Sequence, residues 1–165
     1  MKANIFIAAL LLCIFGCTSK QRSELTLQQK EQIKKDITIL GDSIMARWQR
    51  MDVEGAMQYY SSDFVGFGSE GEQFNFEVYK KSNLESFKST TSYKWTFYHR
   101  TFLAIAKDTV VCACDGKNEL FMKSGDKMTV DPSHYTFAFK KAEGQWKLFY
   151  HHFSGPIVMQ KADKK

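Results

Sequence analysis

The sequence predicts an α+β domain in which helices come first and a long antiparallel sheet follows. Two observations carry this prediction. Apolar residues at helical spacing dominate residues 27–51, whereas residues 93–154 form four long aromatic and β-branched segments joined by short turns. Helices that are segregated from a run of consecutive strands are typical of the α+β class.

The helical part begins with a capped amphipathic helix. Thr26 and Gln29 have the spacing of a capping box, and apolar residues then recur every three or four positions. Gly41 lies inside this helix, where glycine costs about 1 kcal/mol relative to alanine, and we expect it to mark a close backbone crossing. The predicted apolar face consists of Ile33, Ile37, Leu40, Ile44, Trp48 and Met51.

Smaller elements are expected between this helix and the sheet. Asp52 is a predicted N-cap for a short helix over residues 53–60, which Ser61-Ser62-Asp63 would end. The other elements expected here are strands at 64–67 and 73–76 around a turn at 68–71, and a third helix at 77–89.

The sheet is expected to be a meander of four strands. The first two strands are apolar on both faces. One face can pack on the helices, and the other must be shielded from water by something else. We expect a second copy of the chain there, forming a homodimer; the alternative is that the chain's own loops cover it. The strands are expected at 93–106, 109–122, 128–141 and 146–154, with an edge irregularity at Asp131-Pro132.

The last strand is predicted to run from the core into a cavity. Apolar residues begin one of its faces and polar residues end it, as the period of two residues implies. The residues predicted to share this face are Trp146, Leu148, Tyr150, His152 and Ser154.

The N-terminus has the pattern of a targeting segment. Lys2 is followed by an apolar run over residues 5–15, which is shorter than the ~20 residues that span a membrane. The run ends in Ile14-Phe15-Gly16-Cys17, which resembles the bacterial lipobox. That resemblance implies cleavage after Gly16, a lipid on Cys17, and anchoring in the cell envelope, at the outer membrane facing the periplasm. The alternative is an ordinary cleaved signal peptide with an incidental cysteine.

These features divide the chain into four segments. We expect a lipoprotein signal peptide at 1–16, a tether at 17–26, one domain at 27–158 and a basic tail at 159–165. The formal net charge is +5, but the basic residues are spread along the 165-residue chain. Without a basic stripe, no nucleic-acid partner is expected.

Two stretches resemble a known superfamily. The segments "MDVEGAMQYYSSDFVGFGSEG" and "GQWKLFYHHFSGP" are similar to the SnoaL-like, nuclear transport factor 2-like superfamily. The ending also resembles the association domain of calcium/calmodulin-dependent kinase, whose last strand reads Gly-x-Trp-x-Ile-x-His-x-His-x-Ser-Gly. This chain departs from that pattern at Tyr150, where the first His would stand.

The resemblance implies more than the residues alone do. It implies a cone, in which a strongly curved antiparallel sheet wraps around the long N-terminal helix and leaves a pocket at its wide end. It also implies pairing of subunits through the outer sheet face. Members include isomerases, cyclases and dehydratases as well as binding and assembly modules, so the fold does not determine an activity.

Candidate functional residues lie where the strands and the second helix would meet the pocket. His152 is the first candidate for acid or base catalysis, although it could instead hydrogen-bond Ser154 or a loop. Asp63 is the second candidate, although aspartate after a helix commonly forms a turn or a backbone cap. Asp115, which precedes Gly116, is likewise either a catalytic candidate or a turn residue. The residues expected to line a binding pocket are Trp48, Tyr59, Phe67, His134, Tyr150 and His152.

No cofactor and no metal site are expected. His151 and His152 are adjacent on a strand and should point to opposite faces, so they cannot share one ion without a bulge. Cys112 and Cys114 would be about 6–7 Å apart at Cβ, too far for an undistorted disulfide. We interpret these two cysteines as small apolar core residues, or at most as an intermolecular pair.

Three functions are therefore compatible with the sequence. The first is a lipid-anchored, periplasm-facing module that binds a small, partly apolar molecule or serves in assembly. The second is an enzyme of the isomerase, cyclase or dehydratase type with His152 as acid or base. The third is a structural partner in an envelope complex. We favour the binding module over the enzyme, and the sequence leaves an enzymatic activity open.

Overall fold

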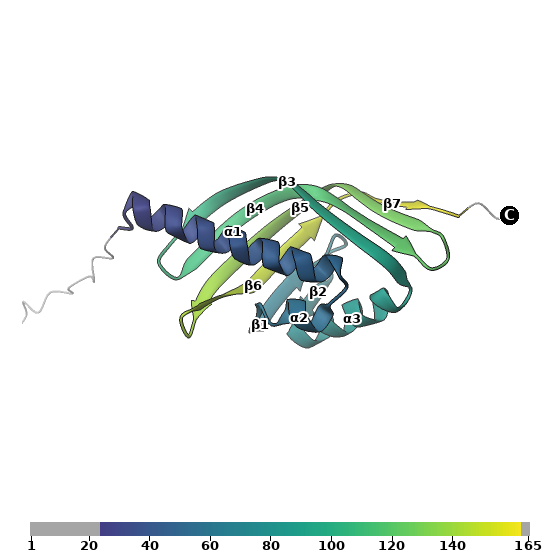
Figure 1. Cartoon of the computed structure of the whole chain (residues 1–165), viewed down its shortest axis with the longest axis horizontal. Coiled ribbons are helices and arrows are strands. Elements are labelled where there is room, and N and C mark those ends of the chain that lie inside the picture. The colour runs from purple at the N-terminus through teal and green to yellow at the C-terminus, as the bar shows by residue number, and fades with distance from the viewer. Residues whose placement is uncertain (1–23, 163–165) are drawn as a thin grey trace, which may run out of the picture.

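The computed structural model describes residues 24–162, so Cys17 and the predicted signal segment lie outside the described residues. The described part is one α+β domain with three helices and one seven-stranded sheet (Figure 1). No helix among residues 24–162 is both long and apolar enough to cross a membrane. The elements are α1 (Leu27–Gln49), α2 (Val53–Met57), β1 (Tyr60–Phe67), β2 (Gln73–Asn75), α3 (Phe76–Lys88), β3 (Thr90–Ile105), β4 (Thr109–Met122), β5 (Lys127–Ala142), β6 (Gln145–Ser154) and β7 (Ile157–Gln160).

Helix α1 confirms the predicted long helix and its cap. Thr26 accepts a hydrogen bond from the Gln29 backbone, and the Gln29 side chain bonds back to the Thr26 N–H. The apolar stripe packs on the concave face of the sheet and buries Ile37, Ile44 and Trp48. Gly41 does mark a close approach, but its neighbour is a side chain: a Cβ there would lie 3.2 Å from Arg100 Nη2.

The sheet has the strand order β2-β1-β6-β5-β4-β3, and β7 pairs with β5. Strands β3 to β6 form the predicted antiparallel meander. Strand β1 pairs with β6 in parallel, however, so the sheet is mixed. As Figure 1 shows, the curved sheet arches over α1, with α2 and α3 near its β1–β2 edge. The predicted curved sheet around a long N-terminal helix is therefore confirmed.

The second helix is shorter than predicted. Asp52 is its N-cap and accepts a hydrogen bond from Gly55 N, as expected, but α2 ends at Met57. Residues 60–63, predicted to finish this helix, are the beginning of β1. Pairing of Tyr60 with Leu148 of β6 explains the difference, because a ladder partner outweighs a weak local helix preference.

The core lies between α1 and the inner sheet face. Cys112 and Cys114 are both free and buried in it, which agrees with their interpretation as small core residues. Only a void of about 20 Å³ lies beside them, under α1. Buried side chains of α1 and the sheet fill most of the space around this void.

Strand β7 was not predicted. Strand β5 pairs with β7 over residues 127–130 and with β6 over residues 134–142, so the Asp131-Pro132 step lies where the partner changes. Gly155 allows the turn between β6 and β7, because a Cβ there would come within 2.6 Å of Pro132 O. Strand β7 crosses the predicted boundary between the domain and the basic tail.

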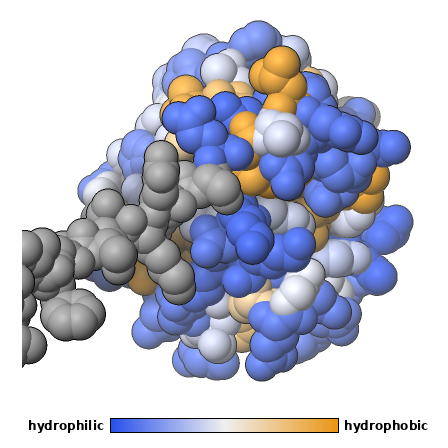
Figure 2. Space-filling model, turned by 90° about the vertical axis from the view of Figure 1, so that its left-hand side faces the viewer, coloured by the Kyte–Doolittle hydropathy of each residue, from blue (hydrophilic) through white to orange (hydrophobic). Residues whose placement is uncertain are grey.

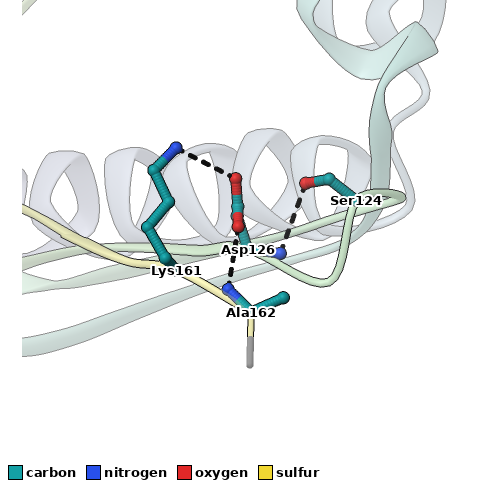
Figure 3. A network of polar contacts seen from close by, with 4 residues as sticks. All are labelled: Ser124, Asp126, Lys161 and Ala162. Atoms are coloured by element: carbon teal, nitrogen blue, oxygen red, sulfur yellow. Dashed lines mark hydrogen bonds and ion pairs between the residues drawn. The ribbon is translucent and has the colours of Figure 1, made fainter. Parts of the chain in front are cut away.

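A polar clamp holds the end of β7 (Figure 3). The Asp126 carboxylate accepts a hydrogen bond from Ala162 N at 2.9 Å and pairs with Lys161 Nζ at 3.2 Å, while Asp126 N donates to Ser124 Oγ at 3.3 Å. These contacts, the Ala162 N–H first, hold the pKa of Asp126 below its usual value. The clamp ties the segment that follows β7 to the β4–β5 turn.

The end of the molecule near the start of α1 is mostly hydrophilic. Figure 2 shows hydrophobic side chains scattered among polar ones on this face, rather than gathered into one broad patch.

Strand β6 corrects the prediction that five of its residues share one face. Leu148 is opposite Phe139 and Tyr150 is opposite Ala138, so Phe149 is an extra residue in a β-bulge. The bulge shifts the alternation by one residue. Trp146 and Leu148 stay on the concave face, whereas Tyr150, His152 and Ser154 lie on the outer face with Ala138, Thr136 and His134.

Candidate functional site: an aromatic-lined cavity on the concave face of the sheet

A cavity of about 240 Å³ lies between α3 and the concave face of the sheet. Helices α1 and α3 and all seven strands contribute residues, so the cavity exists only in the folded chain. Its wall is mostly aromatic, as is common for small-molecule sites. The lining residues include Trp48, Phe74, Tyr79, Asn83, Phe87, Tyr93, Trp95, Asn118, Leu120, Met128, Tyr135, His151 and Phe153.

His151 is the titratable residue most deeply placed in this wall. It pairs with Phe137 of β5 and Gly66 of β1, which puts its ring on the concave face. The ring meets Tyr79 edge-on at a centroid distance of 4.9 Å and Phe64 at 5.2 Å. Gly66 makes room for it, because a Cβ there would lie 3.0 Å from His151 Nε2.

The surroundings of His151 oppose a positive charge. Its side chain is 5% exposed, and burial lowers its pKa to about 3, with a smaller contribution from neighbouring His152. No carboxylate among the described residues hydrogen-bonds to it. His151 is therefore a neutral imidazole near pH 7 and offers one hydrogen-bond donor and one acceptor.

Asn118 and Tyr135 form a polar pair beside it. The Asn118 amide donates a short hydrogen bond to the Tyr135 hydroxyl. Burial raises the pKa of Tyr135, so its phenol is neutral. Two buried atoms of lining residues have no hydrogen-bond partner among the described residues: Asn118 Oδ1 and Trp95 Nε1. The cavity wall thus carries uncharged polar groups with unused bonding capacity.

Charged groups are scarce in the wall. Glu72, which is exposed, is the one charged residue among those that line the cavity in the described structure. Within residues 24–162, no three His, Cys, Asp or Glu side chains gather closely enough to hold a metal ion. The chemistry of the wall suits a neutral, partly apolar molecule.

The predicted pocket residues are divided between two places. Trp48 lines the cavity, where its Nε1 donates to Tyr60 Oη at 3.1 Å. Tyr150 and His152 instead border an open depression of about 480 Å³ on the outer face, with Gly68 and Ser69. Phe67 borders both. We call this second site the outer depression.

The other predicted residues lie away from the cavity. Tyr59 packs against the core, and its carbonyl accepts a hydrogen bond from Leu148 N. His134 is exposed on the outer face, with Nδ1 2.7 Å from Asp115 Oδ1. Asp63 is exposed and paired with Lys140, and that bond, followed by one from Ser61, lowers its pKa. Within residues 24–162, none of these three side chains forms a hydrogen bond with His152.

Three residues of the cavity wall are not among the residues predicted from the sequence: His151, Trp95 and Asn118. Strict alternation through Phe149 predicts the opposite face for His151, and the bulge reverses this. For Asn118 a signal did exist: it is an amide within a long strand, where asparagine is uncommon. Its partner Trp95 is the residue directly across the β3–β4 ladder.

Comparison with known proteins agrees with the geometry. Residues 39–159 match the family model described as SnoaL-like domain. The chain belongs to the SnoaL-like family. No similar sequence was found among curated proteins.

Solved structures share the SnoaL-like fold at low sequence identity. A candidate scytalone dehydratase from Novosphingobium aromaticivorans has a TM-score of 0.74 and 8% identity, covering 85% of this chain and 94% of that one. A hexachlorocyclohexane dehydrochlorinase has a TM-score of 0.71 and 9% identity, covering 82% and 93%. A candidate calcium/calmodulin-dependent protein kinase II association domain from Xanthomonas campestris has a TM-score of 0.64 and 22% identity, covering 74% and 86%. These likenesses establish the nuclear transport factor 2-like fold.

Proposed function

We propose that this SnoaL-like protein binds a small, neutral, partly apolar molecule in its interior cavity. The observation that carries the proposal is the cavity of about 240 Å³, whose wall combines aromatic rings with buried, uncharged polar groups. An aromatic wall supplies affinity through burial of apolar surface, and a few polar groups supply orientation.

Enzymatic activity is the second candidate. In its favour, structural neighbours are named as a dehydratase and a dehydrochlorinase. Against it, a general base works best with a pKa near the working pH, and that of His151 is lowered to about 3. No carboxylate among the described residues bonds to the ring to stabilise an imidazolium. The neutral His151 is better suited to hydrogen-bonding a ligand than to accepting its proton.

The adjacent histidines provide a matched test. His151→Phe keeps a ring but removes both ring nitrogens from the cavity, whereas His152→Phe makes the same change at the outer depression. We expect native mass spectrometry of the purified protein to show a copurifying small molecule that His151→Phe reduces severalfold and His152→Phe retains. The reverse pattern would assign the ligand to the outer depression and refute the cavity.

We also propose that the chain is held at the outer membrane, facing the periplasm, through a lipid on Cys17. Support comes from the lipobox-like Ile14-Phe15-Gly16-Cys17 after a short apolar run. Several acyl chains on one residue would give near-permanent anchoring, since each buried CH₂ adds about 0.8 kcal/mol. Anchored in this way, the domain would act on molecules of the envelope.

We propose finally that two copies of the chain form a homodimer through the outer faces of their sheets. An uncharged row crosses five strands on that face, because each member is the ladder partner of the next. Small side chains in its middle would let two sheets approach closely. The row consists of Val65, Tyr150, Ala138, Val111 and Ala104.

A further inference from the structure

Two polar groups of the cavity wall lack the partners that buried groups normally have. Trp95 and Asn118 are 7% and 5% exposed, and Trp95 Nε1 and Asn118 Oδ1 have no hydrogen-bond partner among the described residues. The great majority of buried polar atoms in native proteins are paired, with protein, water or ligand. Ser133 Oγ is also unpaired but does not belong to the cavity lining.

The two groups are neighbours with opposite hydrogen-bonding roles. Trp95 and Asn118 are direct partners in the β3–β4 ladder, so their Cβ atoms are about 4.5–5.5 Å apart. An indole N–H can only donate, and an amide oxygen can only accept. One N–H of the Asn118 amide donates to the Tyr135 hydroxyl, while the amide oxygen has no partner among the described residues. A group that accepts one bond and donates another at the same atom would satisfy both, and a hydroxyl does this.

We propose that Trp95 and Asn118 are a recognition pair for a hydroxyl group on a neutral ring compound. Trp95 Nε1–H donates to the hydroxyl oxygen, and the hydroxyl donates to Asn118 Oδ1. In the ligand-free protein, a water molecule is the natural occupant with the same bonding pattern. The inference deepens the proposed function and rests on it, because it names the class of molecule that the cavity takes.

The volume of the cavity and the scarcity of charge in its wall restrict the class of ligand further. At the packing density of protein interiors, a cavity of about 240 Å³ holds a molecule of about 180 Å³, which corresponds to two fused rings with small substituents. A charged group would be buried without a partner, since Glu72 is the one charged lining residue of the described chain and is exposed. Many of the lining residues are aromatic, Trp95 and Tyr135 among them, and the faces and edges of such rings favour a flat molecule.

Three matched probes test the pair on the purified full-length protein. Naphthalene has no polar group, 2-methoxynaphthalene can accept but not donate, and 2-naphthol can do both. Dissociation constants are measured at pH 7 by ¹H–¹⁵N NMR titration, with the backbone amide signals of the lining residues Leu120 and Met128, which both variants retain, as reporters. For the wild type we expect 2-naphthol to bind about tenfold more tightly than 2-methoxynaphthalene, and naphthalene to bind most weakly.

Two variants separate the two bonds. Trp95→Phe removes the donor and should weaken both oxygen-bearing probes severalfold while leaving naphthalene nearly unchanged. Asn118→Leu removes the acceptor and should weaken 2-naphthol alone, about tenfold. Ser133→Ala, which removes an unpaired hydroxyl outside the lining, is the control and should change none of the three. If Asn118→Leu fails to fold, the Trp95→Phe pattern decides alone.

The outcomes are distinguishable. If all three probes bind equally well, or if the variants weaken all three equally, the hydroxyl pair is wrong while the binding cavity stands. If none of the probes binds, both the proposed function and the pair are overturned. Loss of 2-naphthol discrimination in Asn118→Leu, with naphthalene unaffected, supports the pair.

Discussion

At His151, the fold places an imidazole where protonation is unfavourable. Burial lowers its pKa to about 3, whereas an unfolded chain has a histidine pKa near 6.5. Between these values the unfolded chain binds a proton that the folded chain does not. Stability attributable to His151 is therefore complete above pH 6.5 and is lost as the pH falls toward 3.

This gives a prediction at the scale of one residue. Lowering the pH from 7 to 5 should reduce the free energy of unfolding by about 2 kcal/mol through His151, as measured by urea denaturation at each pH. The His151→Phe variant should lack this part of the decrease, because it has no titrating ring. His152→Phe is the matched control and should keep it. If the free energy of unfolding decreases equally in wild type and His151→Phe, then the His151 ring binds its proton as readily in the folded protein as in the unfolded chain.

The carboxylates of Asp63 and Asp126 affect the free energy of unfolding at lower pH than His151 does. Asp63 and Asp126 have pKa values lowered by Lys140 and by the Ala162 N–H, respectively. Their contributions are present above their ordinary pKa values near 4 and are lost below them. Because both are exposed or only partly buried, solvent screens these contributions. A decrease between pH 7 and 5 therefore reports on histidine rather than on these acids.

Among the elements, strand β6 determines what faces the cavity. The bulge at Phe149 exchanges the two faces of the strand, so that His151 and Phe153 follow Leu148 on the concave side. Its β1 neighbour is irregular at the same level, between Tyr60 and Val65. Bulges commonly re-aim side chains beside functional sites. Here the bulge sends one histidine inward and its neighbour outward.

The outer sheet face supports a prediction at the scale of elements. Val111 lies between Ala104 and Ala138 in the row that crosses the sheet. A charge there would be buried in the proposed dimer without a partner, so Val111→Glu should convert dimers to monomers. Analytical ultracentrifugation measures this. Val78→Glu changes an exposed valine on α3 and should leave the dimer intact. A wild-type protein that sediments as a monomer at all concentrations would refute the dimer.

For the whole molecule, the decisive question is where the chain is held. Cys17→Ser should abolish incorporation of radiolabelled palmitate and leave the signal segment uncleaved, because the lipid is attached to that thiol. Cys13→Ser, within the predicted signal segment, is the control and should be labelled and processed normally. Labelling of the Cys17→Ser protein would rule out the anchor, and cleavage without a label would indicate an ordinary signal peptide.

Local signals predicted most of the fold. The Thr26–Gln29 capping box and the apolar stripe through Ile37 and Ile44 determine α1, since both act within one helix. The turns at 123–126 and 143–144 similarly define the meander. Element boundaries failed where a distant partner intervened, as at Tyr60, which pairs with Leu148 instead of extending α2.

The site depended on contacts that no local pattern reveals. A bulge leaves no mark in the sequence, because the residues around it still alternate as they do in a regular strand. The β5–β6 register alone assigns Tyr150 and His152 to the outer face. The pairing of Trp95 with Asn118 likewise joins residues on different strands.

Periodicity and turn chemistry in the sequence thus account for the α+β class, the capped helix and the meander, and two sequence motifs carry the family resemblance. Only the tertiary structure decided that β1 joins β6 in parallel, that β7 extends the sheet, and that His151 rather than His152 enters the cavity. The physical reason is that strand register and cavity walls are set by non-local packing, in which one extra residue reverses the two faces of a strand.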